Sequence, residues 1–94
     1  MWVSAQGEID LSVIGSFRKT LQEAVDSRPD EIVVDLSRVS YLDSSGIYAL
    51  LDAWRAVRQM GGQFRILTGN PATTRILELA GLARLLEVDV APVA

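Results

Sequence analysis

The residues best suited to chemistry lie in one short segment, Asp43-Ser44-Ser45-Gly46. A carboxylate and two hydroxyls suit the start of a helix, because side-chain oxygens there accept the N–H groups that the first turn leaves unpaired. Gly46 is the unexpected member, since glycine inside a helix costs about 0.5–1 kcal/mol relative to alanine. We therefore expect a close approach to Gly46, such as by the backbone of another molecule or by a ligand.

The two serines lack the partners of a catalytic nucleophile. The chain contains no His and no Cys. Neither Ser44 nor Ser45 has a Lys at helical spacing or stands in a Gly-x-Ser-x-Gly turn, and the chain has no Gly-rich phosphate-binding loop. Glu87 and Asp89 are too few to form a metal site. We expect a protein that is not an enzyme and that uses no metal ion or cofactor.

Composition and charge favour a small cytoplasmic protein. The 94 residues, 49% of them apolar, suffice for one domain with one core, spanning residues 1–94. The nine basic residues are scattered and the formal net charge is -3, which argues against direct binding of nucleic acid. The longest apolar run covers residues 47–51, far short of the ~18 residues of a membrane span. The N-terminus also lacks a signal-peptide pattern, so we expect no membrane insertion.

The apolar residues change period along the chain, which predicts strands alternating with helices. The expected strands cover residues 2–9, 32–34, 64–67 and 85–90, and the expected helices cover residues 14–25, 47–57 and 71–80. The first strand is expected to end in a turn at Gly7-Glu8-Ile9-Asp10. Pro29 is expected to end the first helix and to hold Arg28 in an extended conformation. The order βαβαβαβ predicts an α/β fold with a mixed, mostly parallel sheet covered by helices, in which residues 32–34 form a central strand.

The Asp-Ser-Ser-Gly segment follows this central strand. Residues 37–45 are predicted to form a polar loop between the central strand and the second helix. Where this loop meets the helix, Asp43, Ser44 and Ser45 are expected at the N-cap and in the first turn. The carboxyl ends of strands in open α/β sheets are where ligands and partners are met. Tyr41 and Tyr48 flank the loop and are candidates for contacts with a partner.

Three blocks of the sequence together resemble the STAS domain family. The blocks are Gly7-Glu8-Ile9-Asp10, the segment from Val33 through the Asp-Ser-Ser-Gly motif to Leu50, and Arg75-Ile76-Leu77-Glu78-Leu79-Ala80-Gly81-Leu82. They occur in the family's order, and within the family the chain is most similar to the bacterial anti-sigma factor antagonists. Family members usually begin with an additional strand, whereas only six residues precede Gly7 here. Either the domain dispenses with that strand or the chain is trimmed. In both cases we expect an exposed sheet edge, which invites pairing with another chain, such as a second copy in a homodimer.

The resemblance implies a small protein that binds a kinase-type anti-sigma factor and thereby frees a sigma factor. It also implies that this serine kinase switches the protein off by phosphorylating Ser44, the residue directly after the motif's Asp, with Ser45 as the fallback acceptor. The residues expected to contact the partner are Asp10, Tyr41, Asp43, Ser44, Ser45, Gly46 and Tyr48.

A phosphate at Ser44 has a physical rationale of its own. It adds about -1.5 to -2 charges, which the start of a helix tolerates but a partner surface pressed against Asp43 does not. We expect it to abolish binding while the fold survives. The same resemblance leaves a second function open, namely a non-switching STAS accessory subunit or domain of a membrane transporter.

Overall fold

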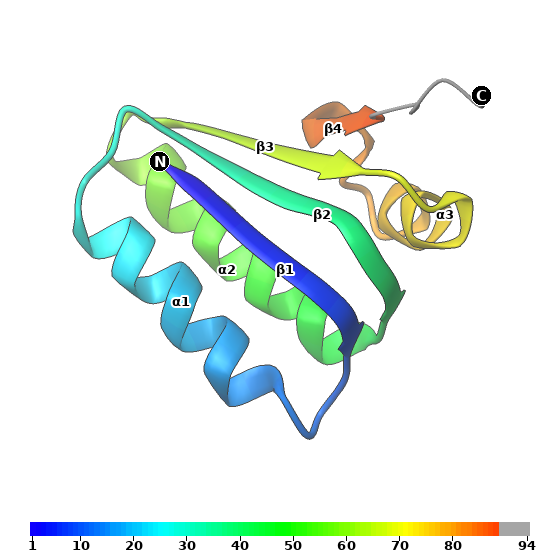
Figure 1. Ribbon diagram of the computed structural model, residues 1–94. Coiled ribbons are helices and arrows are strands. Elements are labelled where there is room, and N and C mark those ends of the chain that lie inside the picture. Colours follow the sequence, from blue (N-terminus) through cyan, green and yellow to red (C-terminus); the bar gives the residue numbers. More distant parts are fainter. Residues whose placement is uncertain (89–94) are drawn as a thin grey trace.

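The protein folds as a four-stranded sheet with a helix between successive strands (Figure 1). The computed structural model describes residues 1–88. In chain order the elements are β1 (Trp2–Ile9), α1 (Ile14–Asp26), β2 (Glu31–Leu42), α2 (Ser44–Gln59), β3 (Gln63–Thr68), α3 (Pro71–Leu79), a 3-10 helix (Ala83–Leu85) and β4 (Leu86–Val88). The strands lie in the order β1-β2-β3-β4, and every pairing among them is parallel. The predicted α/β class is confirmed, with β2 central and without an antiparallel pair among the described strands.

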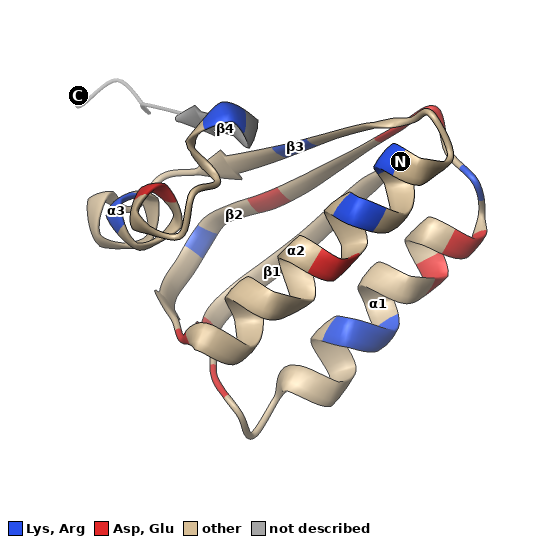
Figure 2. Cartoon of the chain, turned by 180° about the vertical axis from the view of Figure 1, so that it is seen from behind, with Lys and Arg blue, Asp and Glu red and all other residues tan. Residues whose placement is uncertain are grey.

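One apolar core holds the sheet and the helices together. Helices α1 and α2 lie next to each other on one face of the sheet (Figures 1 and 2). The apolar spacing of α1 marks its buried face, which contributes Phe17, Leu21, Ala24 and Val25. In α2 the prediction holds only in part: Leu50 and Val57 are buried together with Ala49 and Ala53, whereas Ile47, Leu51 and Trp54 are only partly buried against the core. Helix α3 packs against β2 and β3 and adds the fully buried Leu77. No helix in residues 1–88 is both long and apolar enough to cross a membrane.

Strand β2 is longer than the sequence predicted. It continues through Leu42, so the prediction of a polar loop over residues 37–45 is wrong for most of that segment. The outer half of β2 is a strand because Val39 and Leu42 are buried, while residues 38–42 pair with the second half of β1. Register shifts after Ser4 and after Gly7 interrupt the alternation of apolar and polar residues, which hides the strand in the sequence.

The chain also turns differently at three places. Gly7 lies inside β1 with a φ of 79° at a register shift, so the turn begins after Ile9. Arg28 is left-handed rather than extended, with a φ of 51°, because its N–H closes the end of α1 by donating to the Val25 carbonyl at 3.0 Å. Of the predicted last strand, residues 86–88 form β4, Leu85 ends the 3-10 helix, and residues 89–90 lie outside the described residues.

The left-handed conformation of Arg28 yields a test of this fold. A side chain in that region costs about 1–2 kcal/mol, so Arg28→Gly should raise the free energy of unfolding by roughly 0.5–1 kcal/mol after the extra entropy of unfolded glycine is offset. Arg58→Gly, inside α2, should lower it by about 1 kcal/mol. Urea unfolding measures both, and a destabilised Arg28→Gly variant would contradict the assigned conformation.

Candidate functional site

Asp43 fixes the start of α2. It is the N-cap residue in an extended conformation, and its Oδ1 accepts the backbone N–H of Ser45 at 3.0 Å and that of Gly46 at 3.3 Å. The Ser45 hydroxyl donates to the same oxygen at 2.5 Å. The predicted cap is therefore confirmed, with Ser44 and Ser45 as the first two residues of the helix.

A turn of the same design lies beside it, between β1 and α1. Asp10 Oδ1 accepts the backbone N–H of Ser12 at 3.0 Å and the Ser12 hydroxyl at 2.5 Å. Asp10-Leu11-Ser12 thus repeats the arrangement of Asp43-Ser44-Ser45. The Asp43 N–H donates to the Ile9 carbonyl at 3.2 Å, which joins the two turns and brings Asp10 next to the loop.

Asp43 carries a stabilised negative charge. Its pKa lies below the ordinary value of 3.8, chiefly because the Ser45 hydroxyl donates to the carboxylate. Burial opposes this shift, and backbone N–H groups of Gly46, Ser45 and Leu11 add to it. The site therefore holds a fixed anion one residue before Ser44.

The two serines differ in accessibility and in bonding. Ser44 is exposed, and within residues 1–88 its hydroxyl has no hydrogen-bond partner. Ser45 is half-buried, and its hydroxyl is engaged by Asp43. Of the two candidate acceptors, Ser44 is the one whose oxygen can reach another molecule without breaking the helix cap.

Gly46 is required for a reason inside the protein. It is buried, and a Cβ added there would collide with Leu42 Cδ1 and lie 3.2 Å from Ile9 Cγ2. Leu42 is itself fully buried, so it has little room to move. The expectation that an external backbone or ligand approaches Gly46 is corrected accordingly: the close approach comes from the ends of β1 and β2.

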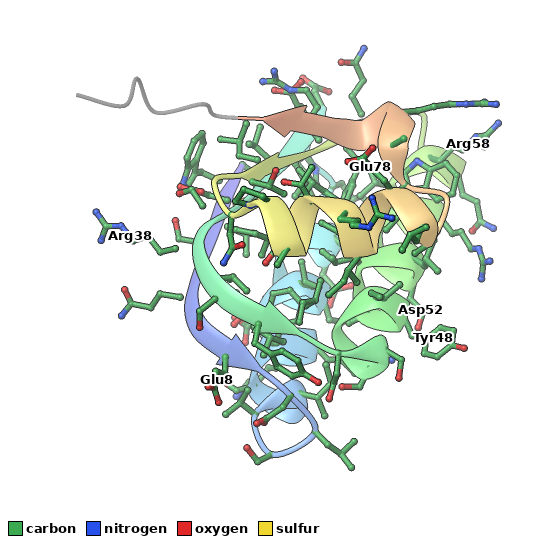
Figure 3. All side chains as sticks on the ribbon, turned by 90° about the vertical axis from the view of Figure 1, so that its right-hand side faces the viewer. Glu8, Arg38, Tyr48, Asp52, Arg58 and Glu78 are labelled. Atoms are coloured by element: carbon green, nitrogen blue, oxygen red, sulfur yellow. The ribbon has the colours of Figure 1, made fainter. Side chains whose placement is uncertain are left out.

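Three exposed apolar side chains belong to the segments that adjoin Ser44. Tyr41 is 49% exposed and Tyr48 is 61% exposed. Tyr48 lies four residues after Ser44, hence on the same side of α2, and Figure 3 shows it projecting outward near Asp52. Leu11, at the tip of the neighbouring turn, is 75% exposed. We call Leu11, Tyr41, Ser44 and Tyr48 the Ser44 surface.

Sequence reasoning missed Leu11 as a candidate contact. The signal was the repeated Asp-x-Ser pattern, which places Leu11 and Ser44 at equivalent positions of two adjoining turns. A large apolar side chain left in water at a turn tip, beside other exposed apolar groups, is typical of a protein-binding surface.

The charges around this surface are mainly acidic. Figure 2 shows acidic segments where β1 and β2 end, which are the positions of Glu8, Asp10 and Asp43. Farther along, Arg18 of α1 forms an ion pair with Asp52 of α2 at 3.0 Å. In the described part of the chain, no three His, Cys, Asp or Glu residues are grouped so that they could hold a metal ion.

The chain and its fold match a known class of protein. The family model described as the STAS domain matches residues 1–92, and the chain belongs to this family. The resemblance found in the sequence is thereby confirmed.

Two similar relatives are named as antagonists of anti-sigma factors. The anti-sigma F factor antagonist of Paenibacillus polymyxa is 30% identical over 87 residues, which cover 92% of this chain and 74% of the relative. The anti-sigma-B factor antagonist of Staphylococcus aureus is 28% identical over 87 residues, covering 93% of this chain and 81% of the relative.

Solved structures agree with the fold. An anti-sigma factor antagonist from Mycobacterium paratuberculosis matches with a TM-score of 0.83 at 28% identity, covering 97% of this chain and 77% of that protein. The unphosphorylated form of the anti-sigma factor antagonist SpoIIAA has the same fold, with a TM-score of 0.83 at 21% identity over 96% of this chain and 79% of that protein.

Packing beneath Gly46 can be tested by adding one methyl group. Gly46→Ala should lower the free energy of unfolding by about 1–3 kcal/mol, because the buried Leu42 must move. Gly15→Ala is the matched control: a Cβ on Gly15 of α1 meets nothing within 4 Å, so this variant should gain up to about 1 kcal/mol. Thermal unfolding compares the two, and equal stability of both variants would refute the packing argument.

The cap can be tested through the titration of Asp43. A carboxyl whose pKa is lower when folded contributes stability above its unfolded pKa, and loses it as the pH falls through the folded value. Ser45→Ala removes the main cause of the shift and should raise the pKa of Asp43 toward 3.8. Carboxyl-carbon NMR titration measures this. Thr20→Ala, which removes a hydroxyl bonded to the Ser16 carbonyl, should leave the pKa of Asp43 unchanged. If Ser45→Ala also leaves the pKa of Asp43 as it is in the unaltered chain, the Ser45 hydroxyl is not the cause of the lowered pKa.

Proposed function

We propose that this protein is an anti-sigma factor antagonist that binds a kinase-type anti-sigma factor through the Ser44 surface and so frees a sigma factor. The observation that carries the proposal is the exposed hydroxyl of Ser44 in the first turn of α2, which has no hydrogen-bond partner among the described residues and has exposed apolar side chains on the adjoining segments. The names of the curated relatives support it. The role is one of binding rather than catalysis, and it takes place in the cytoplasm.

Ser44 is the residue that the kinase modifies in this proposal. The Ser44 Oγ attacks the terminal phosphorus of a nucleoside triphosphate held by the kinase, forming the new P–O bond as the bond to the departing diphosphate breaks. The hydroxyl proton passes to a base of the kinase. Ser45 is disfavoured as the acceptor because its phosphorylation would remove the hydrogen bond from the Ser45 hydroxyl to Asp43, the shortest one in the cap.

The phosphate ends binding through charge. It stands one residue from the ionised Asp43, while the helix N–H groups of Ser45 and Gly46 are already bonded to that carboxylate. The new charge is therefore left facing the partner, where removing it from water is costly. The fold itself occurs in an unphosphorylated and a phosphorylated form in SpoIIAA.

Modification at Ser44 is tested with the purified anti-sigma factor kinases of the source organism and ATP. Mass spectrometry should find one phosphate on the unaltered chain and on Ser45→Ala, and none on Ser44→Ala. Phosphate on Ser45 would overturn the proposal. So would the absence of phosphate with every kinase together with stable co-purification with a transporter subunit, a result that favours the transporter accessory role.

Binding to the same kinase is tested with charge and apolar variants. Ser44→Ala should bind as the unaltered chain does, whereas Ser44→Asp should bind at least about tenfold more weakly because it leaves a charge facing the partner. Leu11→Ala should cost about 1–2 kcal/mol of binding free energy.

Leu79→Ala is the matched control for Leu11→Ala. Leu79 on α3 is also 75% exposed, yet it lies outside the Ser44 surface. The Leu79→Ala variant should therefore bind the kinase as tightly as the unaltered chain does. Isothermal titration calorimetry measures all four variants. Equal affinity of Ser44→Asp and Ser44→Ala would contradict the charge mechanism, and equal losses at Leu11 and Leu79 would contradict the proposed surface.

A further inference from the structure

Helix α2 turns one ridge of side chains away from the core. The buried residues of the helix define the side that packs on the sheet. At 3.6 residues per turn, the opposite side carries Ser44, Tyr48, Leu51, Arg55 and Arg58. All of them are exposed except Leu51, which is half-buried. Figure 3 shows Tyr48 and Arg58 on the same side of the molecule. We call these five residues the α2 ridge.

The two ends of the ridge carry opposite charge. The first end lies beside the acidic groups of Asp10 and Asp43. The second half of the helix carries the guanidinium groups of Arg55 and Arg58 (Figure 2). Within residues 1–88 neither arginine has a carboxylate partner. Arg58 lies over the ring of Trp54, 5.6 Å from its centroid. The basic end can therefore bind an anion that another molecule supplies.

The spacing along the ridge is symmetric about Leu51. Ser44 lies seven residues before Leu51, and Arg58 lies seven residues after it. Seven residues make close to two helical turns, so both lie about 10 Å from Leu51 along the axis and on nearly the same side. If two copies of α2 pack antiparallel with Leu51 at the two-fold axis, Ser44 of each copy lies opposite Arg58 of the other. Arg55 then lies beside Tyr48 of the other copy.

A phosphate on Ser44 completes this charge pattern. Guanidinium groups bind phosphate oxygens through paired, charge-assisted hydrogen bonds. Within one chain Arg58 is out of reach, because it lies about 21 Å from Ser44 along the helix axis. The antiparallel pair instead brings the arginines of the second copy to the phosphate.

We propose that two copies of this protein pair antiparallel through the α2 ridge, and that phosphate on Ser44 of each copy is bound by Arg55 and Arg58 of the other. A second copy suits the ridge because it supplies both charges at matching distances, so the same contact forms twice. The phosphate itself rests on the proposed function. The pair covers Ser44 and Tyr48, so association as well as charge withholds the modified protein from the kinase.

Association is tested with phosphoserine built into position 44 during synthesis of the 94-residue chain. Sedimentation equilibrium should give a dimer dissociation constant at least about tenfold lower than that of the unmodified chain. The side-chain N–H signals of Arg55 and Arg58 in NMR spectra should shift as the concentration of the modified chain rises. The signal of Arg38, which Figure 3 shows on the opposite side of the molecule, should stay in place. Because no kinase is used, failure of this test leaves the proposed function untouched.

Charge exchange tests the pairing of positions 44 and 58. In the modified chain, Arg58→Glu should weaken the dimer at least about tenfold. Arg38→Glu, the same substitution at an exposed position of β2, should leave the dimer unchanged.

The double variant tests the same pairing without phosphate. Ser44→Lys and Arg58→Glu should each weaken association of the unmodified chain, since the new lysine faces Arg58 and the new glutamate faces Asp43 of the other copy. Combined in one chain, the two substitutions place opposite charges face to face. The double variant should associate at least about fivefold more tightly than either single variant, which also shows that both substitutions leave the chain folded.

Four results would overturn the proposal. One is the same dissociation constant with and without phosphate on Ser44. Another is an equal loss of association by Arg58→Glu and Arg38→Glu. A third is a double variant that associates no more tightly than the single ones. The last is an unchanged dimer together with weaker binding of the kinase by Arg58→Glu, which would assign the α2 ridge to the kinase. If urea unfolding is all that Arg58→Glu alters, Arg58 serves only the helix dipole.

Discussion

The hydrogen bonds of Asp43 are the interaction on which the candidate site depends. The Asp43 N–H binds the carbonyl of Ile9, its side chain holds two backbone N–H groups and a hydroxyl of the first helical turn, and its carbonyl accepts the N–H of Ile47. One residue thereby joins the end of β1, the end of β2 and the start of α2. Because α2 begins directly after Asp43, the backbone of Ser44 is fixed as the first residue of the helix. The Ser45 hydroxyl bonds to Asp43, whereas the Ser44 hydroxyl takes no part in the cap.

Packing beneath the cap enforces the same geometry. Gly46 lets the first turn of α2 rest on Leu42 and Ile9, the last residues of two neighbouring strands. A larger residue would force Leu42 or the first turn of α2 to move. The cost of a glycine in a helix, about 0.5–1 kcal/mol, is offset by this close approach, which exists whether or not a partner is bound.

The sequence predicted those parts of the fold that local pattern determines. Helix faces, the Asp43 cap and the central position of β2 follow from spacing and residue type, and the structure has them. The outer half of β2 could not be predicted, because Ser37, Arg38 and Ser40 look like a loop until β1 supplies hydrogen bonds and Val39 finds the core. Arg28 was mispredicted for a similar reason: the restraint from Pro29 is weaker than the bond that ends α1. Leu11 escaped notice because exposure at a turn tip depends on how two turns adjoin.

Strand β1 is divided by irregularities in its own pairing. Residues 2–4 pair regularly with residues 33–35, and the register then shifts twice before Glu8 and Ile9 meet Tyr41 and Leu42. Such a shift absorbs local changes in strand twist and alignment, because it interrupts the ladder of hydrogen bonds. The position of the Ile9 carbonyl, which accepts the Asp43 N–H, is therefore set by the last residues of β1 and β2 rather than by the first half of the strand.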